Sequence, residues 1–168
     1  MSGFKKRAKK VKILVMDVDG VLTDAGMYYG EDGEEFKKFN TKDGMGISLI
    51  HSAGIKTAII TKEKTKIVER RAKKLNITEV HQGVDDKLLV LNNILSRRKL
   101  SLDQACYIGD DINDYKVLRE VGLAVVVNDA HERVKKVAHY VTARKGGEGA
   151  VREVCDLILE VHQINKEG

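Results

Sequence analysis

Two aspartates that follow a short apolar run are the residues most suggestive of chemistry in this sequence. Asp17 and Asp19 come directly after residues 11–16, whose aliphatic and β-branched side chains are typical of a buried strand. In open α/β sheets ligands bind at the carboxyl ends of the strands, so both carboxylates are expected at a crevice. The chain turns there, and we expect the backbone carbonyl of Asp19 to point beside the Asp17 carboxylate. One carboxylate and one carbonyl oxygen suit Mg²⁺.

Aspartates are also common turn and cap residues after strands, which is the alternative for this pair. Polar residues after the other predicted strands favour the catalytic interpretation. They are Thr61 after the second strand, Lys87 at the start of the helix beyond the third, and Asp110, Asp111 and Asp114 after the fourth. Phosphoryl transfer needs a nucleophile, donors for the phosphoryl oxygens and a cation, and this set supplies all three.

The residue types indicate a division of roles in such a reaction. Asp17 is the expected nucleophile, forming an aspartyl phosphate. Asp19 is expected to protonate the leaving oxygen and then, as a carboxylate, to activate water. Lys87 and the Thr61 hydroxyl, together with backbone N–H groups near Val18 and Asp19, are expected to hold the phosphoryl oxygens.

A magnesium site follows from the same carboxylates. We expect Mg²⁺ to bind Asp17, the carbonyl of Asp19 and Asp110, with water and substrate completing an octahedron. Asp111 or Asp114 would orient those waters without touching the ion.

The elements that must position these residues alternate along the chain. Strands are expected at residues 11–16, 55–61, 79–81, 104–108, 123–127 and 139–142, and helices at residues 43–53, 62–75, 84–98, 112–120, 130–138 (with Asp129 as N-cap) and from residue 146 onward. Residues 27–30 and 35–39 should form a small hairpin around residues 31–34. This order predicts an α/β fold, a Rossmann-like doubly wound and mostly parallel sheet with helices on both faces and a β-hairpin flap after the first strand.

Length and composition limit the class of protein. A chain of 168 residues suits a single domain with a real core. It has no run of about 18 apolar residues, and residues 1–12 lack the apolar stretch of a secretory signal. We therefore expect a cytoplasmic protein without a membrane partner. Cys106 and Cys155 are expected to be buried free thiols.

The net charge of +5 is concentrated at the N-terminus. Six of the first twelve residues are basic and none is acidic, so the remaining 24 basic and 25 acidic residues nearly balance. We expect residues 1–11 to be a solvated basic arm, with contact to phosphates or acidic surfaces as the alternative. No aromatic or groove-reading pattern accompanies the arm, so no nucleic-acid partner is expected.

Four motifs resemble those of a known enzyme family. DVDGVLTD at residues 17–24, the Thr61 position, GVDDK at residues 83–87 and GDDIND at residues 109–114 are similar to the four motifs of the haloacid dehalogenase superfamily of aspartyl-phosphate hydrolases. They occur in the family order over almost the whole chain. The resemblance implies an Mg²⁺-dependent phosphomonoesterase with these residues in the roles given above.

Three further stretches resemble one small branch of that superfamily. LTD at residues 22–24, FNTKDGMGI at residues 39–47 and GGEGAVRE at residues 146–153 are similar to the capless branch that includes 3-deoxy-D-manno-octulosonate 8-phosphate phosphatase. This implies hydrolysis of a small sugar-acid phosphate in lipopolysaccharide sugar synthesis by a homotetramer. The spacing agrees independently, because residues 24–61 and 61–87 leave no room for a cap domain.

In the resembling branch neighbouring subunits close the site, the hairpin building the tetramer and the C-terminal segment reaching an adjacent site. By that analogy Lys42, Arg144, Lys145 and Arg152 are candidates for binding a sugar-acid carboxylate or hydroxyls. Exposed or salt-bridged surface charge is the alternative for each. The glycines of residues 146–149 are equally consistent with an anion-binding loop and with a helix start.

One position departs from the branch pattern. The branch usually carries Gly-Arg after the second motif, whereas this chain has Lys62 and Glu63 after Thr61. Because Thr61 is kept, the phosphatase chemistry is expected to survive, and Lys62 or Lys42 are candidates to compensate for the reversed charge. A different sugar phosphate or a nonulosonate 9-phosphate is the alternative substrate.

Two other classes of protein share parts of this pattern. A receiver-like signalling domain also combines acidic residues, a Thr and a Lys, but its phospho-acceptor lies between the acidic pair and the Thr. Here Thr61 and Lys87 precede Asp110. A non-catalytic binding module of the same fold would have no physical need for the intact set of Asp17, Asp19 and these three residues.

Overall fold

Six parallel strands form the central sheet, in the order β5-β4-β1-β6-β7-β8. The computed structural model describes residues 2–31 and 35–164. The strands are β1 (Ile13–Met16), β4 (Lys56–Ile60), β5 (Glu79–His81), β6 (Ala105–Gly109), β7 (Leu123–Val126) and β8 (Tyr140–Val141). The predicted doubly wound parallel sheet is confirmed.

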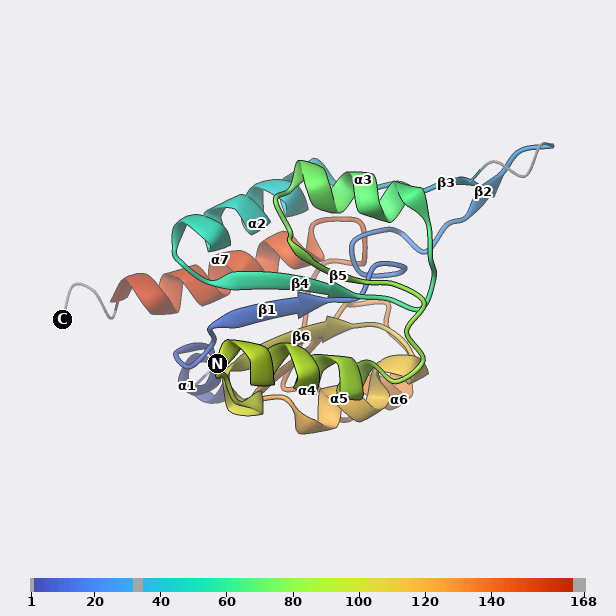
Figure 1. Ribbon diagram of the computed structural model, residues 1–168. Helices are drawn as coiled ribbons and strands as arrows, with labels where there is room; N and C mark the ends of the chain where they lie inside the picture. Colours follow the sequence, from blue (N-terminus) through green and yellow to red (C-terminus); the bar gives the residue numbers. More distant parts are fainter. Residues whose placement is uncertain (1, 32–34, 165–168) are drawn as a thin grey trace.

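Helices cover both faces of this sheet. They are α1 (Ser2–Ala8), α2 (Thr41–Ser52), α3 (Lys66–Lys74), α4 (Lys87–Arg98), α5 (Tyr115–Glu120), α6 (Glu132–Lys135) and α7 (Ala150–Ile164), with 3₁₀ turns at Leu102–Gln104 and Ile112–Asp114. Figure 1 shows α2, α3 and α7 on one face and α4, α5 and α6 on the other. With both faces covered, every residue of β1, β6 and β7 is buried, which explains their continuous apolar sequences.

The chain reverses its direction of winding beside β1. The segment after β1 passes through α2 to β4 on one side, and β6 lies on the other side of β1. This is the topological switch point, where a crevice opens beyond the carboxyl ends of the strands. The sequence places Asp17 directly after β1, at that point.

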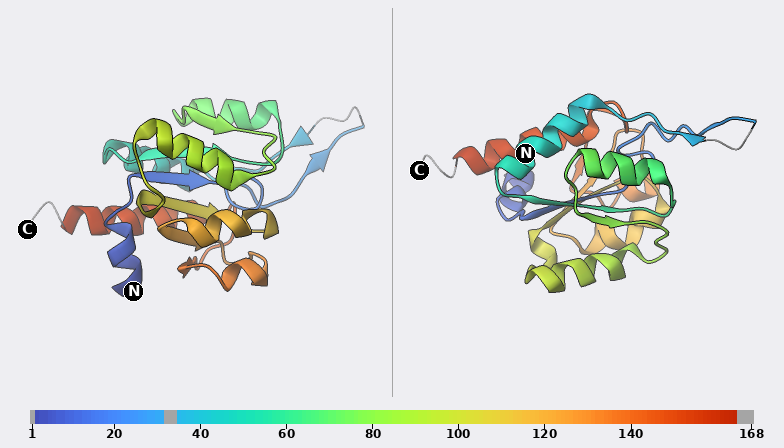
Figure 2. Two further views of the ribbon diagram at one scale, coloured as in Figure 1. Left: turned by 60° about the horizontal axis from the view of Figure 1, so that its bottom comes forward. Right: turned by 45° about the horizontal axis from the view of Figure 1, so that its top comes forward.

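A two-stranded hairpin extends from the same edge of the sheet (Figures 1 and 2). It consists of β2 (Tyr28–Tyr29) paired antiparallel with β3 (Glu35–Phe36), as predicted. The residues 32–34 of the expected turn lie outside the described residues. Tyr28, Tyr29 and Phe36 are each more than half exposed.

All six helices predicted from the sequence begin two to four residues away from their predicted starts. Helices α3 and α4 begin a few residues late, each after a residue whose side chain accepts a backbone N–H of the first turn: Thr65 for α3 and Asp86 for α4. The predicted cap Asp129 is wrong, because His131 caps the short α6. The Asp129 carboxylate accepts instead from the backbone N–H of Gly146 at 3.0 Å.

Both cysteines are buried free thiols, as predicted. Burial raises the pKa of Cys106 and of Cys155. Among the described residues no helix has the length and apolar character needed to cross a bilayer.

The N-terminal segment is not a solvated arm. Residues Ser2–Ala8 form α1, in which Phe4 and Ala8 are buried, and Val11 after it is buried too. The Phe4 ring lies 5.1 Å from the ring of Tyr140, and the carbonyl of Ala8 lies 3.0 Å from Nε2 of His162. These three apolar residues recur at helical spacing and form the buried face of the segment, while the lysines between them are exposed.

We expect Phe4→Ala to lower the free energy of unfolding by about 3 kcal/mol, because it removes a buried aromatic ring and leaves a cavity. Urea denaturation measures this, with the exposed Lys9→Ala as the matched control. Activity per folded molecule should not change, since α1 lies at the end of the sheet opposite the hairpin (Figure 1). Equal stability of the two variants would restore the interpretation as a loose arm.

Candidate active site

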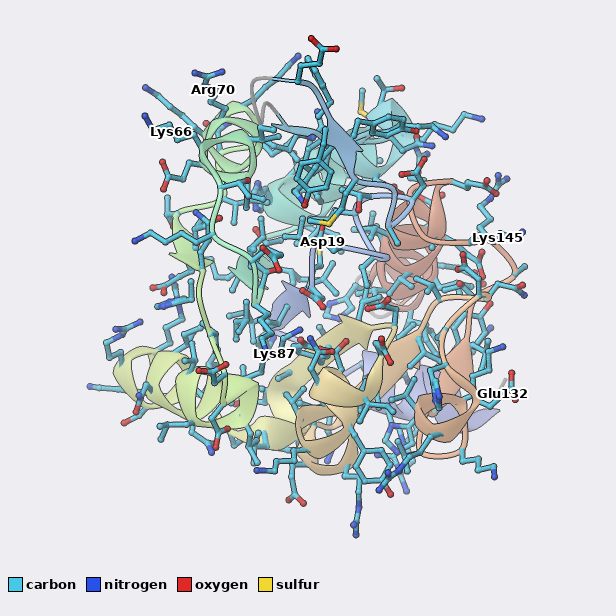
Figure 3. All side chains as sticks on the ribbon, turned by 90° about the vertical axis from the view of Figure 1, so that its right-hand side faces the viewer. Asp19, Lys66, Arg70, Lys87, Glu132 and Lys145 are labelled. Atoms are coloured by element: carbon cyan, nitrogen blue, oxygen red, sulfur yellow. The ribbon has the colours of Figure 1, made fainter. Side chains whose placement is uncertain are left out.

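A cleft of about 250 Å³ lies at the carboxyl ends of β1, β4 and β6. Its lining includes Asp17, Asp19, Thr61, Lys62, Glu63, Asp110 and Asp111. Figure 3 looks onto this edge of the sheet, with Asp19 and Lys87 near its centre. The structure therefore brings together the residues that the sequence placed after three separate strands.

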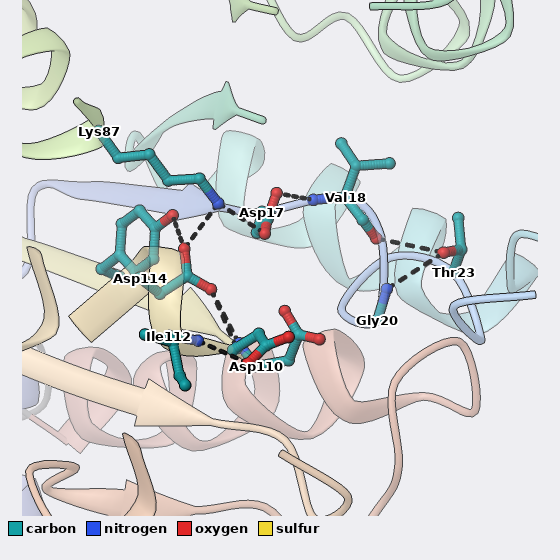
Figure 4. A network of polar contacts seen from close by, with 10 residues as sticks. Asp17, Val18, Gly20, Thr23, Lys87, Asp110, Ile112 and Asp114 are labelled. Carbon is teal, nitrogen blue, oxygen red and sulfur yellow. Dashed lines mark hydrogen bonds and ion pairs between the residues drawn. The ribbon is translucent and has the colours of Figure 1, made fainter. Parts of the chain in front are cut away.

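The ammonium group of Lys87 lies between two buried carboxylates (Figure 4). Its Nζ donates to Asp17 Oδ2 at 2.6 Å and to Asp114 Oδ1 at 2.7 Å, and the three side chains are at most 5% exposed. Lys87 is the first residue of α4, so the loop after β5 and the cap at Asp86 fix where its side chain begins. Lys87 thus links β1, α4 and the turn after β6.

Asp114 is saturated with hydrogen bonds. Besides Lys87, the hydroxyl of Tyr107 donates to Asp114 Oδ1 at 2.7 Å, and the backbone N–H of Asp110 donates to Oδ2 at 2.9 Å. The 3₁₀ turn at Ile112–Asp114 folds this carboxylate under the end of β6. Asp114 therefore holds Lys87 and the loop that carries Asp110 in place.

Burial and like charge determine the electrostatics of this cluster. Burial raises the pKa of Asp110 to about 8, and the charges of Asp17 and Asp114 add to the shift. The pKa of Asp17 is also raised, first by burial and then by Asp114, against the opposing effect of Lys87. Burial would lower the pKa of Lys87, but the two carboxylates outweigh it and the pKa is raised. One ammonium group does not balance three carboxylates.

The cluster meets the requirements of a hard divalent cation. Asp17, Asp110 and Asp114 each offer a carboxylate oxygen, and these atoms lie within 4.8 Å of one another. Gly20 has a φ of +82°, and a Cβ there would lie 2.1 Å from Asp110 Oδ2. Only glycine leaves room for that carboxylate. Oxygen ligands and surplus negative charge are what Mg²⁺ prefers.

Asp19 and Thr61 also face the cleft. Thr61 is buried at the end of β4. Asp19 is partly exposed, and its Oδ1 accepts a hydrogen bond of 2.7 Å from Lys37 Nζ, whose side chain is completely buried. The N–H of Val18, a predicted phosphate donor, donates to Asp17 Oδ1 at 2.7 Å in this structure.

Sequence reasoning missed two residues of this site, Lys37 and Tyr107. Tyr107 lies within an apolar strand, so the sequence pattern predicts an ordinary core residue there. The one available signal is that a buried tyrosine hydroxyl needs a hydrogen-bond partner. Lys37 follows β3 among other charged residues, a pattern typical of a solvent-exposed hairpin. Asp111 lines the cleft and is exposed, and its carboxylate accepts from the N–H of Ile112 at 2.7 Å; its place beside the metal stays a prediction.

Two of the three stretches that resemble the capless branch, residues 39–47 and 146–153, meet at the starts of α2 and α7. Asn40 caps α2 with its side-chain oxygen, and its Nδ2 donates to the carbonyl of Gly147 at 3.1 Å. The carboxylate of Asp43 accepts from the backbone N–H of Arg152 at 2.8 Å. The burial of Asp43 raises its pKa to about 6. These contacts join α2 to α7.

The glycine loop before α7 packs against the loop that follows Asp17. A Cβ on Gly146 would lie 1.8 Å from the carbonyl oxygen of Gly20. The N–H of Gly147 donates to the carbonyl of Val21, and that of Gly146 donates to Asp129. Close backbone approach therefore explains these glycines, and both N–H groups already have protein acceptors.

The four predicted substrate-binding residues do not line the cleft of this chain. Lys42, Arg144 and Lys145 are exposed, and Figure 3 shows Lys145 far to one side of Asp19 and Lys87. The Nε of Arg152 donates to Asp156 at 2.8 Å, one turn further along α7. Their role in substrate binding stays a prediction.

The chain has close relatives of known activity. Residues 34–154 match the family model of haloacid dehalogenase-like hydrolases. The sequence is 48% identical over 154 residues to 3-deoxy-D-manno-octulosonate 8-phosphate phosphatase of Yersinia pestis, covering 92% of this chain and 82% of that protein. The chain belongs to this phosphatase family of haloacid dehalogenase-like hydrolases. The same enzyme of Escherichia coli K12 is 45% identical over 153 residues, covering 91% of this chain and 81% of that protein.

Solved structures of the phosphatase family share this fold. The Moraxella catarrhalis enzyme, in complex with magnesium, phosphate and a KDO molecule, has a TM-score of 0.94 and 42% identity, covering 96% of this chain and 92% of that chain. The cobalt-bound enzyme of Haemophilus influenzae has a TM-score of 0.89 and 33% identity, covering 92% and 91%. The resemblance and the fold class drawn from the motifs are confirmed.

Lys87→Met should destabilise the fold by at least about 3 kcal/mol, because it leaves Asp17 and Asp114 buried without their cation. Urea denaturation at neutral pH measures the loss. The control is Lys116→Met, an exposed lysine of α5, which should change stability by no more than about 0.5 kcal/mol. If the two variants unfold alike, the buried ion pairs do not support the site.

Proposed function

We propose that this protein hydrolyses 3-deoxy-D-manno-octulosonate 8-phosphate through an aspartyl-phosphate intermediate. The observation that carries the proposal is the cluster at the end of β1, where Asp17 lies 2.6 Å from Lys87 and shares the cleft with Asp19, Thr61 and Asp110. That constellation supplies nucleophile, proton donor and phosphate ligands. The substrate is suggested by relatives at 45–48% identity.

The first half of the proposed reaction transfers the phosphoryl group to Asp17. A carboxylate oxygen of Asp17 forms a bond to phosphorus while the ester P–O bond breaks. The departing sugar oxygen takes both electrons of that bond and a proton from the carboxyl group of Asp19. The products of this half are the free sugar acid, an aspartyl phosphate and an ionised Asp19.

The second half releases the phosphate. Asp19, now a carboxylate, takes a proton from water as the water oxygen bonds to phosphorus. The bond between phosphorus and Asp17 breaks and its electrons return to the carboxylate. Inorganic phosphate leaves, and both aspartates are restored to their starting protonation states.

The surrounding residues stabilise the charge on the phosphoryl oxygens. Lys87 and the Thr61 hydroxyl would donate to them, along with backbone N–H groups of residues 18 and 19. Asp17, the carbonyl of Asp19 and Asp110 would hold Mg²⁺, which when bound supplies positive charge against the phosphoryl oxygens. Asp114, whose oxygens are already engaged by Lys87, Tyr107 and the N–H of Asp110, supports this arrangement without touching the ion.

We infer that substrate selection involves more than one subunit. The exposed side chains of Tyr28, Tyr29 and Phe36 give the hairpin an apolar surface suited to the homotetramer that the family resemblance implies. In such an assembly Lys42 and residues 144–152 of one subunit could face the cleft of another. A single domain spanning residues 1–168 and a cytoplasmic location also remain our predictions.

A nonulosonate 9-phosphate is the second candidate substrate. Lys62 and Glu63 line the cleft where the branch usually carries Gly-Arg. Glu63 is exposed at the cleft wall, so it could accept hydrogen bonds from the hydroxyls of a longer sugar acid. Lys62 Nζ lies 3.7 Å from Asp85 and is otherwise exposed.

The substrate is tested by Mg²⁺-dependent phosphate release from 3-deoxy-octulosonate 8-phosphate, a nonulosonate 9-phosphate, hexose phosphates and an aryl phosphate. We expect kcat/KM for the octulosonate ester to exceed that for hexose phosphates at least tenfold. A preference for the nonulosonate ester would replace the first substrate with the second. Equal activity on all esters would overturn both substrates while keeping the chemistry.

The chemistry is tested on the same panel with Asp17→Asn, which keeps the shape of the side chain and removes its nucleophile. We expect a loss of at least about a thousandfold in kcat with an unchanged melting temperature. Asp103→Asn, an exposed aspartate in a 3₁₀ turn, is the control and should retain full activity. Ordinary turnover by Asp17→Asn would remove Asp17 as the nucleophile.

A further inference from the structure

The hairpin contributes one buried cation to the cleft. Lys37 follows β3, and its Nζ donates to Asp19 Oδ1 at 2.7 Å. The Lys37 side chain is completely buried and Asp19 is 26% exposed. This pair joins two parts of the chain that are 18 residues apart, the loop after β1 and the arm of the hairpin. Lysine side chains are rarely buried unless they are paired, and this one is paired with Asp19.

The two oxygens of Asp19 are in different surroundings. Oδ1 accepts a hydrogen bond from Lys37 Nζ, whereas Oδ2 has no hydrogen-bond partner among the described residues and is shielded from solvent. An ammonium group has only donors, so the oxygen that accepts from it is a poor place for a proton. A proton on the Asp19 carboxyl group therefore belongs on Oδ2.

We propose that Lys37 is a positioning residue that fixes the orientation of the Asp19 carboxyl group and directs its transferable proton to Oδ2. The inference rests on the proposed role of Asp19 as proton donor to the leaving oxygen. The proposed effect of Lys37 on the reaction acts through Asp19. The effect is geometric, because a carboxyl group rotated about its bond would present the wrong oxygen to the ester.

The neighbouring Lys38 is an exposed lysine of the same hairpin and serves as a comparison for Lys37. Lys38 Nζ lies 3.3 Å from Asp24, and the Lys38 side chain is 59% exposed. It belongs to the same hairpin arm, has the same charge and pairs with an aspartate of the same loop. Lys38→Met is thus a matched control for Lys37→Met, differing in burial and in the aspartate that is contacted.

The test compares two esters that differ in their need for a proton. p-Nitrophenyl phosphate has a good leaving group, whereas 3-deoxy-octulosonate 8-phosphate releases an alkoxide that must be protonated. The ratio of their kcat/KM values depends on the step in which the leaving group departs. An unfolded fraction of the sample lowers both values by the same factor and leaves the ratio unchanged. For Lys37→Met we expect kcat/KM on the sugar ester to fall at least thirtyfold and on the aryl ester less than threefold. Lys38→Met should leave both values unchanged.

Two further variants make the outcome decisive. Asp19→Asn should lower kcat/KM on the sugar ester much more than on the aryl ester. If it does not, the proposed role of Asp19 fails. If Asp19→Asn discriminates between the esters but Lys37→Met lowers both equally or neither, the positioning role is wrong and the proposed function stands. Lys37→Arg keeps the cation and should restore at least a third of the native ratio, which also tests the inference if Lys37→Met does not fold.

Discussion

The placement of one ammonium group between two buried carboxylates is the constraint on which the site depends. Lys87 cannot be moved or neutralised without leaving the buried carboxylates of Asp17 and Asp114 uncompensated. Such a cluster is stable only when its remaining donors and acceptors are satisfied. The hydroxyl of Tyr107 and the N–H of Asp110 do this for Asp114, and the N–H of Val18 does it for Asp17. Asp17, the proposed nucleophile, is therefore held by groups from several elements.

Close backbone packing is the second constraint. Gly20 leaves room for the Asp110 carboxylate, and the loop at residues 146–147 lies directly on the loop after β1. Helix α7, which follows that loop, is tied to α2 by the Asp43 carboxylate. The loop before the C-terminal helix thus supports the loop after β1 through backbone contacts, and the hairpin contacts the same loop through Lys37.

The sequence predicted the parts of this site that carry a local signal. Asp17 and Asp19 follow an apolar strand, and the acidic group around Asp110 follows another, so topology alone brings them to one edge. Tyr107 and Lys37 could not be found in this way, because their partners are distant in sequence and their own neighbourhoods resemble core and surface.

The errors in the fold have similar causes. In α1 the lysines concealed the helical spacing of Phe4 and Ala8, which pack against a helix and a strand from the other end of the chain. Asp129 has the right type for a cap, but its carboxylate is taken by the distant loop at Gly146. Both depend on tertiary contacts that no local pattern contains.

The central claim is that the carboxylates exceed the charge of Lys87 and form a site for a divalent cation. The most direct measurement is the melting temperature of the native chain and of Asp110→Asn as Mg²⁺ is added. The account predicts a saturable rise for the native chain and a much smaller rise, at higher Mg²⁺, for Asp110→Asn. No rise in the native chain, or the same rise in both, would contradict it.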